Sequence, residues 1–154
     1  MPKKSAGLIA YRRTDDGLEV LLVHPGGPFW QRKDLAAWSI PKGEFAPDEN
    51  PLEAARREFE EETGFPAIGP FSELEPVKQP GGKVVVAWAV EGNLDAAAVR
   101  SNTFSIEWPR GSGKQQEFPE IDRAAWFPIE MARKKILKGQ LPLLDQLEAK
   151  VQAR

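Results

Sequence analysis

Three glutamates within two turns of one predicted helix constrain this chain more than any other feature. Glu58, Glu61 and Glu62 stand at positions i, i+3 and i+4 in the segment GEFAPDENPLEAARREFEEETGF, residues 43–65. On a helix that turns about 100° per residue, their side chains project within roughly 100° of one another. Three like charges on one face repel each other unless a cation lies among them. Oxygen ligands at this density suit a hard divalent ion such as Mg²⁺ or Mn²⁺, which commonly binds substrate phosphates as well.

The same segment predicts where the helix begins and ends. Asn50 is a suitable N-cap, Pro51 fits the first helical position, and Glu53 stands three residues after the cap, as a capping box requires. Gly64 can take the left-handed conformation that ends a helix. The helix is expected to dock on a sheet through an apolar stripe formed by Leu52, Ala55 and Phe59.

Segment 43–65 also resembles the signature of the Nudix (MutT-like) hydrolases. That signature is G, five residues, E, seven residues, then REUxEExGU, where U is a bulky aliphatic or aromatic residue. Every fixed position is filled here, by Gly43, Glu49, Arg57, Glu58, Phe59, Glu61, Glu62, Gly64 and Phe65. The resemblance implies metal-dependent hydrolysis of a pyrophosphate bond in a nucleoside diphosphate linked to another moiety. A catalytically inactive Nudix fold that senses nucleotides is the main alternative, and a merely solvated acidic face is the other.

The resemblance also implies roles for individual residues. Glu58, Glu61 and Glu62 are expected to ligate the metal, Gly43 to offer its backbone carbonyl, and Glu49 and Arg57 to orient the loop and the ligands. A further glutamate from a downstream loop, as ligand or base, is expected at Glu120, with Glu117 as second choice. The predicted catalytic set is therefore Glu58, Glu61, Glu62, Arg57 and Glu120, and the predicted metal set is Gly43, Glu58, Glu61, Glu62 and Glu120. Which glutamate acts as general base is left open.

Length and composition limit the number of domains and the kinds of partner that the chain can have. The 154 residues suit one domain, 1–154, around a single core. The net charge of −2 gives no broad basic field, so strong nucleic-acid binding is not expected. The absence of cysteine excludes disulfides and thiolate metal sites and fits the cytoplasm. We expect neither a signal peptide nor a membrane span. The sequence leaves open whether the protein is a monomer or a homodimer.

Apolar runs predict strands near residues 6–11, 18–24, 84–90 and 124–127, of which the first two form a hairpin. Helices are predicted over residues 128–137 and 141–151. Strands interrupted by helices indicate an α+β or α/β fold, and the resemblance makes it an α/β/α sandwich with a mixed β-sheet.

Two segments rich in glycine and proline, residues 25–37 and 109–119, are predicted as long loops that frame a site. They supply most of the candidate substrate-binding residues, with Lys42 added from beside the signature. In these candidates an aromatic ring could stack on a base and a cation could meet a phosphate. The set is Phe29, Trp30, Lys42, Arg110 and Lys114, each weighed against an ordinary loop anchor or exposed cation. Trp38 is interpreted as core, and His24, the single histidine, as structural.

Features outside the signature predict the substrate. Overall length and the strand Lys83–Trp88 resemble the small dinucleoside polyphosphate hydrolases, which makes a diadenosine tetraphosphate type of substrate the first choice. Pro80 stands where enzymes that hydrolyse ADP-ribose tend to have a proline, but it lies in a plain Gln-Pro-Gly-Gly turn. Gly82 stands where diadenosine polyphosphate enzymes tend to have tyrosine. ADP-ribose and nucleoside triphosphates therefore stay as alternatives.

Overall fold

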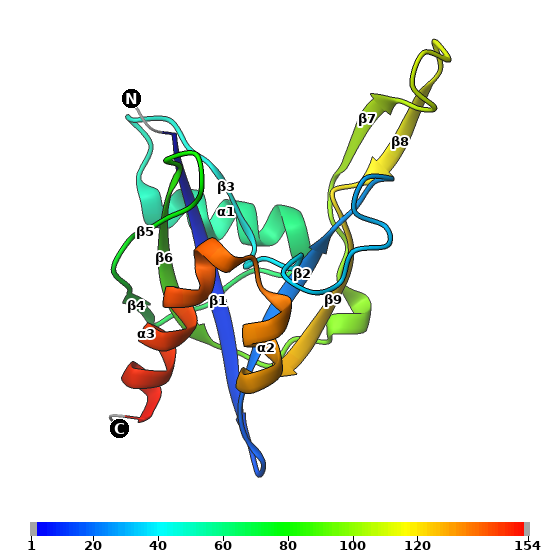
Figure 1. Ribbon diagram of the computed structural model, residues 1–154. Coiled ribbons are helices and arrows are strands. Elements are labelled where there is room, and N and C mark those ends of the chain that lie inside the picture. Colours follow the sequence, from blue (N-terminus) through cyan, green and yellow to red (C-terminus); the bar gives the residue numbers. More distant parts are fainter. Residues whose placement is uncertain (1–2, 153–154) are drawn as a thin grey trace.

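The computed structural model describes residues 3–152 and is built on one mixed β-sheet flanked by helices (Figure 1). The sheet runs in the order β4-β6-β1-β2-β9, with β3 paired to β1 and β5 paired to β6. Its strands are β1 (Lys4–Thr14), β2 (Gly17–Pro25), β3 (Lys42–Glu44), β4 (Phe71–Glu73), β5 (Val77–Lys78), β6 (Val84–Glu91) and β9 (Ile121–Pro128). Strands β1 and β6 are parallel, whereas every other pair in this sheet is antiparallel. The predicted mixed sheet and the predicted β1–β2 hairpin are confirmed.

Helices cover both faces of the sheet, which confirms the α/β/α sandwich (Figure 1). The helical segments are α1 (Pro51–Thr63), α2 (Ile129–Lys135), α3 (Leu141–Gln152) and the short 3₁₀ turns η1 (Ala96–Ala98) and η2 (Lys138–Gln140). Because side chains alternate along a strand, Leu8 faces α1 and the adjacent Ile9 faces α2 and α3. Phe59 fills the α1 side, while Leu144 fills the opposite side. Each layer is thus anchored by a separate buried cluster.

Strand β1 changes partners along its length, and this change creates the space for a site. Its first residues, Ser5 to Gly7, pair with β3, while its last residues, Tyr11 to Thr14, pair with β2. Between these regions β2 and β3 diverge, and the segment from Trp38 to Pro41 crosses the gap. That segment is held by hydrogen bonds between Val23 and Ser39 at 2.9 Å in each direction. The N-terminal end of β3 therefore lies beside the C-terminal end of β2.

A β-hairpin arm projects from the body where the sequence predicts a loop (Figure 1). It consists of β7 (Thr103–Glu107) and β8 (Gln115–Pro119), paired antiparallel as a separate two-stranded sheet. The prediction of a loop over residues 109–119 is thus wrong for Gln115–Pro119. Polar residues dominate β8, and the apolar alternation that marks a strand lies mainly in β7, so only the pairing partner identifies the second strand.

Among residues 3–152, no helix is both long enough and apolar enough to cross a membrane.

Candidate active site

Helix α1 is fixed at both ends by the predicted residues, and this fixes the direction of its glutamates. The Asn50 side chain accepts a hydrogen bond from the Glu53 amide at 3.0 Å. Gly64 ends the helix with φ of 81°, and its N–H donates to the Glu60 carbonyl at 2.8 Å. Phe59 is buried on the sheet, so its neighbours Glu58 and Glu62 flank the sheet side of the helix.

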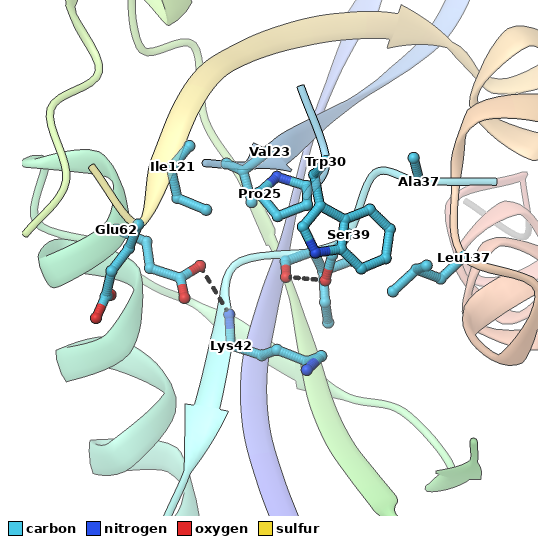
Figure 2. Close-up of a pocket in the computed structure, with 11 residues that line it drawn as sticks. Val23, Pro25, Trp30, Ala37, Ser39, Lys42, Glu62, Ile121 and Leu137 are labelled. Carbon is cyan, nitrogen blue, oxygen red and sulfur yellow. Dashed lines mark hydrogen bonds between the residues drawn. The ribbon is translucent and has the colours of Figure 1, made fainter. Parts of the chain in front are cut away.

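Gly43 lies directly against the carboxyl group of Glu58. A Cβ atom added at Gly43 would fall 2.1 Å from Glu58 Cδ and 2.2 Å from its Oε2, which no side chain can occupy without displacing the carboxylate. The neighbouring Lys42 N–H donates to Glu62 Oε1 at 3.2 Å (Figure 2). The start of β3 and the glutamate face of α1 are therefore in direct contact.

Glu120 joins the same cluster through three backbone hydrogen bonds that tie four segments of the chain together. The Glu61 carbonyl accepts from the Asn102 amide at 3.0 Å, and the Asn102 carbonyl accepts from the Glu120 amide at 2.8 Å. The Glu120 carbonyl in turn accepts from the Gly26 amide at 2.8 Å. Glu120 thus stands beside the C-terminal end of α1, whereas Glu117 lies within the arm, paired opposite Ser105. Of the two candidate downstream glutamates, only Glu120 comes near the others.

The carboxylates perturb one another. Burial raises the pKa of Glu62 to about 8, and the charge of Glu58 adds to the rise. Burial, followed by the charge of Glu61, raises the pKa of both Glu58 and Glu120. Burial lowers the pKa of Lys42, and the nearby charge of Lys83 lowers it further. A bound divalent cation would favour the ionised form of these crowded carboxylates and so offset the rise in their pKa values.

Arg57 lies on the exposed side of the cluster. Its guanidinium contacts Glu49 at 2.8 Å, Glu58 at 3.1 Å and Glu61 at 3.6 Å. The hydrogen bond to Glu49 raises the pKa of Arg57, and hydrogen bonds from Ala46 N–H and from Arg57 lower that of Glu49. Among residues 3–152, no three acidic or imidazole side chains converge to the spacing of a metal centre. The donor set nevertheless fits Mg²⁺ or Mn²⁺ in its chemistry, because it is oxygen-only and anionic.

A cavity of about 290 Å³ opens next to these carboxylates (Figure 2). Glu62, Glu120 and Lys42 line one end of it. The remainder is mostly apolar and is lined by Val23, Pro25, Trp30, Ala37, Ser39, Ile40, Ile121 and Leu137. An acidic end beside an apolar wall with one aromatic ring suits a ligand that has both phosphates and a flat base.

Buried polar contacts hold the segment that leads into β3. Gln140 is fully buried; its Oε1 accepts from the Ile40 amide at 3.1 Å, and its Nε2 donates to Ser39 Oγ and to Gln79 Oε1, each at 3.0 Å. Three hydrogen bonds from one amide side chain fix the approach to Lys42. Nothing in the sequence pattern near Gln140 indicated this contact, which joins residues a hundred positions apart.

The five candidate substrate-binding residues divide into two groups. Lys42 and Trp30 line the cavity. Phe29, Arg110 and Lys114 belong to the region of the arm and line none of this cavity: Phe29 meets Trp108 edge-on at 5.4 Å, and Arg110 lies over the Phe29 ring at 5.6 Å. Lys114 is exposed in the turn of the arm. The interpretation of Trp38 as core holds, because its side chain is 4% exposed.

The fold thus places the glutamates of α1 and Glu120 at one end of an open cavity beside a mixed sheet. A family model, NUDIX domain, matches residues 1–147. The chain therefore belongs to the NUDIX family and is a pyrophosphohydrolase. No curated protein sequence matches it.

Solved structures of the same fold are similar to this chain at low sequence identity. An Ap4A hydrolase from C. elegans, in a binary complex, is 24% identical with a TM-score of 0.66, over 97% of this chain and 99% of that one. The NUDIX domain of Shewanella oneidensis NrtR, complexed with ADP ribose, is 18% identical with a TM-score of 0.68, over 98% and 89%. A mutT/nudix family protein from Listeria innocua is 19% identical with a TM-score of 0.65, over 99% and 96%. Identities this low support the fold alone.

Proposed function

We propose that this protein, acting as one NUDIX domain, hydrolyses a pyrophosphate bond in a dinucleoside polyphosphate of the diadenosine tetraphosphate type, with Mg²⁺ or Mn²⁺ as cofactor. The observation that carries the proposal is the cavity with carboxylates at one end and an apolar, tryptophan-containing wall at the other. Glu58, Glu61, Glu62 and Glu120, with the carbonyl of Gly43, would hold the metal. When bound, the metal would neutralise phosphate charge and lower the pKa of an attacking water.

The chain's own residues would position the substrate and accept the proton that the attacking water loses. Whichever of Glu62 and Glu120 does not hold the metal would accept the proton from water, because both line the cavity and burial raises the pKa of each. Lys42, on the cavity and half-buried, would meet a phosphate oxygen as a point charge. Arg57 would hold Glu58 and Glu61 in place from outside the cavity. Trp30 would stack on a base.

We take the first choice of substrate from the C. elegans Ap4A hydrolase, whose fold this chain shares over nearly the whole length of both chains. A second candidate, ADP-ribose, is favoured by the comparable similarity to the NrtR domain complexed with ADP ribose. A panel of dinucleoside polyphosphates, ADP-ribose and nucleoside triphosphates, each incubated with Mg²⁺ or Mn²⁺ and analysed by product chromatography, separates them. Faster cleavage of ADP-ribose than of every dinucleoside polyphosphate would refute the substrate assignment.

A matched pair of variants separates an enzyme from a nucleotide sensor. We expect Glu61→Gln to lower kcat by roughly two orders of magnitude or more while the fold is kept. Glu60→Gln removes the same charge from the neighbouring, exposed position of α1 and should leave kcat within about twofold. Equal turnover by Glu61→Gln and the wild type would remove the catalytic assignment. Ligand that binds the wild type and persists without cleavage would make the protein a sensor.

A further inference from the structure

Phe29 and Trp30 are neighbours in the chain, but their rings contact different parts of the molecule. Trp30 lines the cavity (Figure 2), whereas Phe29 lies outside it, against the arm. Phe29 is 51% exposed, and among residues 3–152 no other aromatic residue is exposed. A single exposed apolar residue is common on protein surfaces. What Phe29 can do therefore depends on how its ring is held and on what lies beside it.

The arm holds the Phe29 ring in place while half of the residue stays exposed. Trp108 meets the ring edge-on, with centroids 5.4 Å apart, and the Arg110 guanidinium lies over it at 5.6 Å. The loop also packs closely on the base of the arm, because a Cβ atom at Gly26 would lie 1.9 Å from the Pro119 carbonyl oxygen. Phe29 is thus a fixed aromatic surface, on which a flat base could stack with little loss of side-chain freedom.

The cavity has room for only part of a dinucleoside polyphosphate. Its volume of about 290 Å³ lies at the lower end of the range for pockets that enclose one drug-sized ligand, roughly 300–1,000 Å³. The proposed substrate has two nucleosides joined by a chain of phosphates. With one base on Trp30 and phosphates at Glu62 and Glu120, the second nucleoside must lie outside the cavity, beyond its acidic end.

The arm starts at this acidic end. Glu120 directly follows β8, so the last strand of the arm runs from its turn down to the cavity. The turn, residues 108–114, carries two cations, Arg110 and Lys114, and no acidic residue. Glu107, which precedes the turn, accepts a hydrogen bond from a turn amide at 2.7 Å. The arm therefore offers cations and an aromatic surface on the side where the rest of the substrate must lie.

We propose that Phe29, held by Trp108 and Arg110 of the arm, forms a second-nucleoside subsite: its ring stacks on the base that the cavity cannot hold. The subsite selects substrates with a nucleoside at both ends of the phosphate chain over nucleotides with a nucleoside at one end. It rests on the proposed function, because the cavity must bind the first nucleoside. Trp30 contacts that first base and acts alike on both kinds of substrate.

Two substrates isolate the subsite: diadenosine tetraphosphate, and adenosine tetraphosphate, which has the same phosphate chain without the second nucleoside. Phe29→Leu keeps an apolar side chain against the arm and removes the aromatic ring. We expect it to lower the ratio of kcat/KM for diadenosine tetraphosphate to kcat/KM for adenosine tetraphosphate about tenfold, the loss of one base–aromatic stack. Comparing this ratio between variants cancels the difference in charge between the substrates. If adenosine tetraphosphate is not cleaved, the reciprocal of its inhibition constant replaces its kcat/KM.

Two control variants separate stacking from a structural role of the loop. Phe29→Tyr keeps the ring and should keep the ratio of the wild type. Leu35→Ala removes a side chain from the same loop at a residue that is 68% exposed, and it should leave both kcat/KM values within about twofold. Equal losses on both substrates in Phe29→Leu, or an unchanged ratio, would overturn the subsite alone. A wild type that does not cleave diadenosine tetraphosphate would overturn the proposed substrate and the subsite together.

Discussion

The contact between Gly43 and Glu58 yields a prediction that separates activity from stability. In Gly43→Ala, the new Cβ would lie 2.1 Å from Glu58 Cδ, whereas ordinary contacts of a Cβ begin at 3.4 Å. The carboxyl group must therefore retreat by about 1.3 Å, the difference between these two distances. Its position at the end of a flexible side chain makes that movement inexpensive in stability, and Gly43 does not have a positive φ that would strain alanine.

We expect Gly43→Ala to change the free energy of unfolding by less than about 1 kcal/mol and to lower kcat/KM by roughly 100-fold, the usual consequence of a 1 Å misplacement in a catalytic site. Urea denaturation measures the first quantity and initial-rate kinetics the second. Gly92→Ala is the matched control, because its Cβ would meet no atom within 4 Å. Activity of Gly43→Ala within tenfold of the wild type would refute the reasoning that Glu58 acts from its observed position. A loss of several kcal/mol in stability would show instead that the carboxyl group cannot move.

Three further predictions concern the parts of the molecule that support this site. In metal-free protein, the raised pKa of Glu62 contributes stability that is fully present below the pKa of the unfolded state, about 4.5, and is lost as pH rises through the pKa of the folded state, about 8. Glu62→Gln should therefore flatten the fall in unfolding free energy between these two pH values. The same fall in the variant as in the wild type, measured in EDTA, would contradict this prediction. Asn50→Ala should lower stability by about 1 kcal/mol in urea denaturation, because the Glu53 amide loses its acceptor, and no loss would show that the cap is dispensable. Leu144→Ala should lower it by about 2–5 kcal/mol in the same assay, because Leu144 is fully buried; a loss below 1 kcal/mol would mean that the core collapses around the change.

The local structure of α1 could be predicted because its signals are local. Asn50 and Gly64 define the helix ends through contacts with residues three or four positions away, and Phe59 defines the buried side. The strands with apolar runs were predicted for the same reason. The arm was predicted only in part, since β8 is polar and becomes a strand through its pairing with β7.

Contacts between distant segments limited what the sequence could predict about the site. Glu120 was a candidate from resemblance, but its place beside α1 depends on hydrogen bonds through Asn102 that no sequence spacing encodes. The candidate binding residues from the two loops looked equivalent, yet Trp30 lines the cavity and Phe29 packs against the arm. The pairing of His24 with Asp122 spans 98 positions, and a lone histidine in the sequence gave no indication of its partner.

The proposed chemistry requires that the glutamates of α1, with Glu120, hold a divalent cation. Isothermal titration calorimetry of metal-free protein with Mn²⁺ tests it most directly, with Glu61→Gln and Glu60→Gln as the matched pair. We expect saturable binding by the wild type and by Glu60→Gln, and binding by Glu61→Gln that is at least about tenfold weaker. Absence of saturable Mn²⁺ binding by the wild type, or equal affinity in all three proteins, would contradict it.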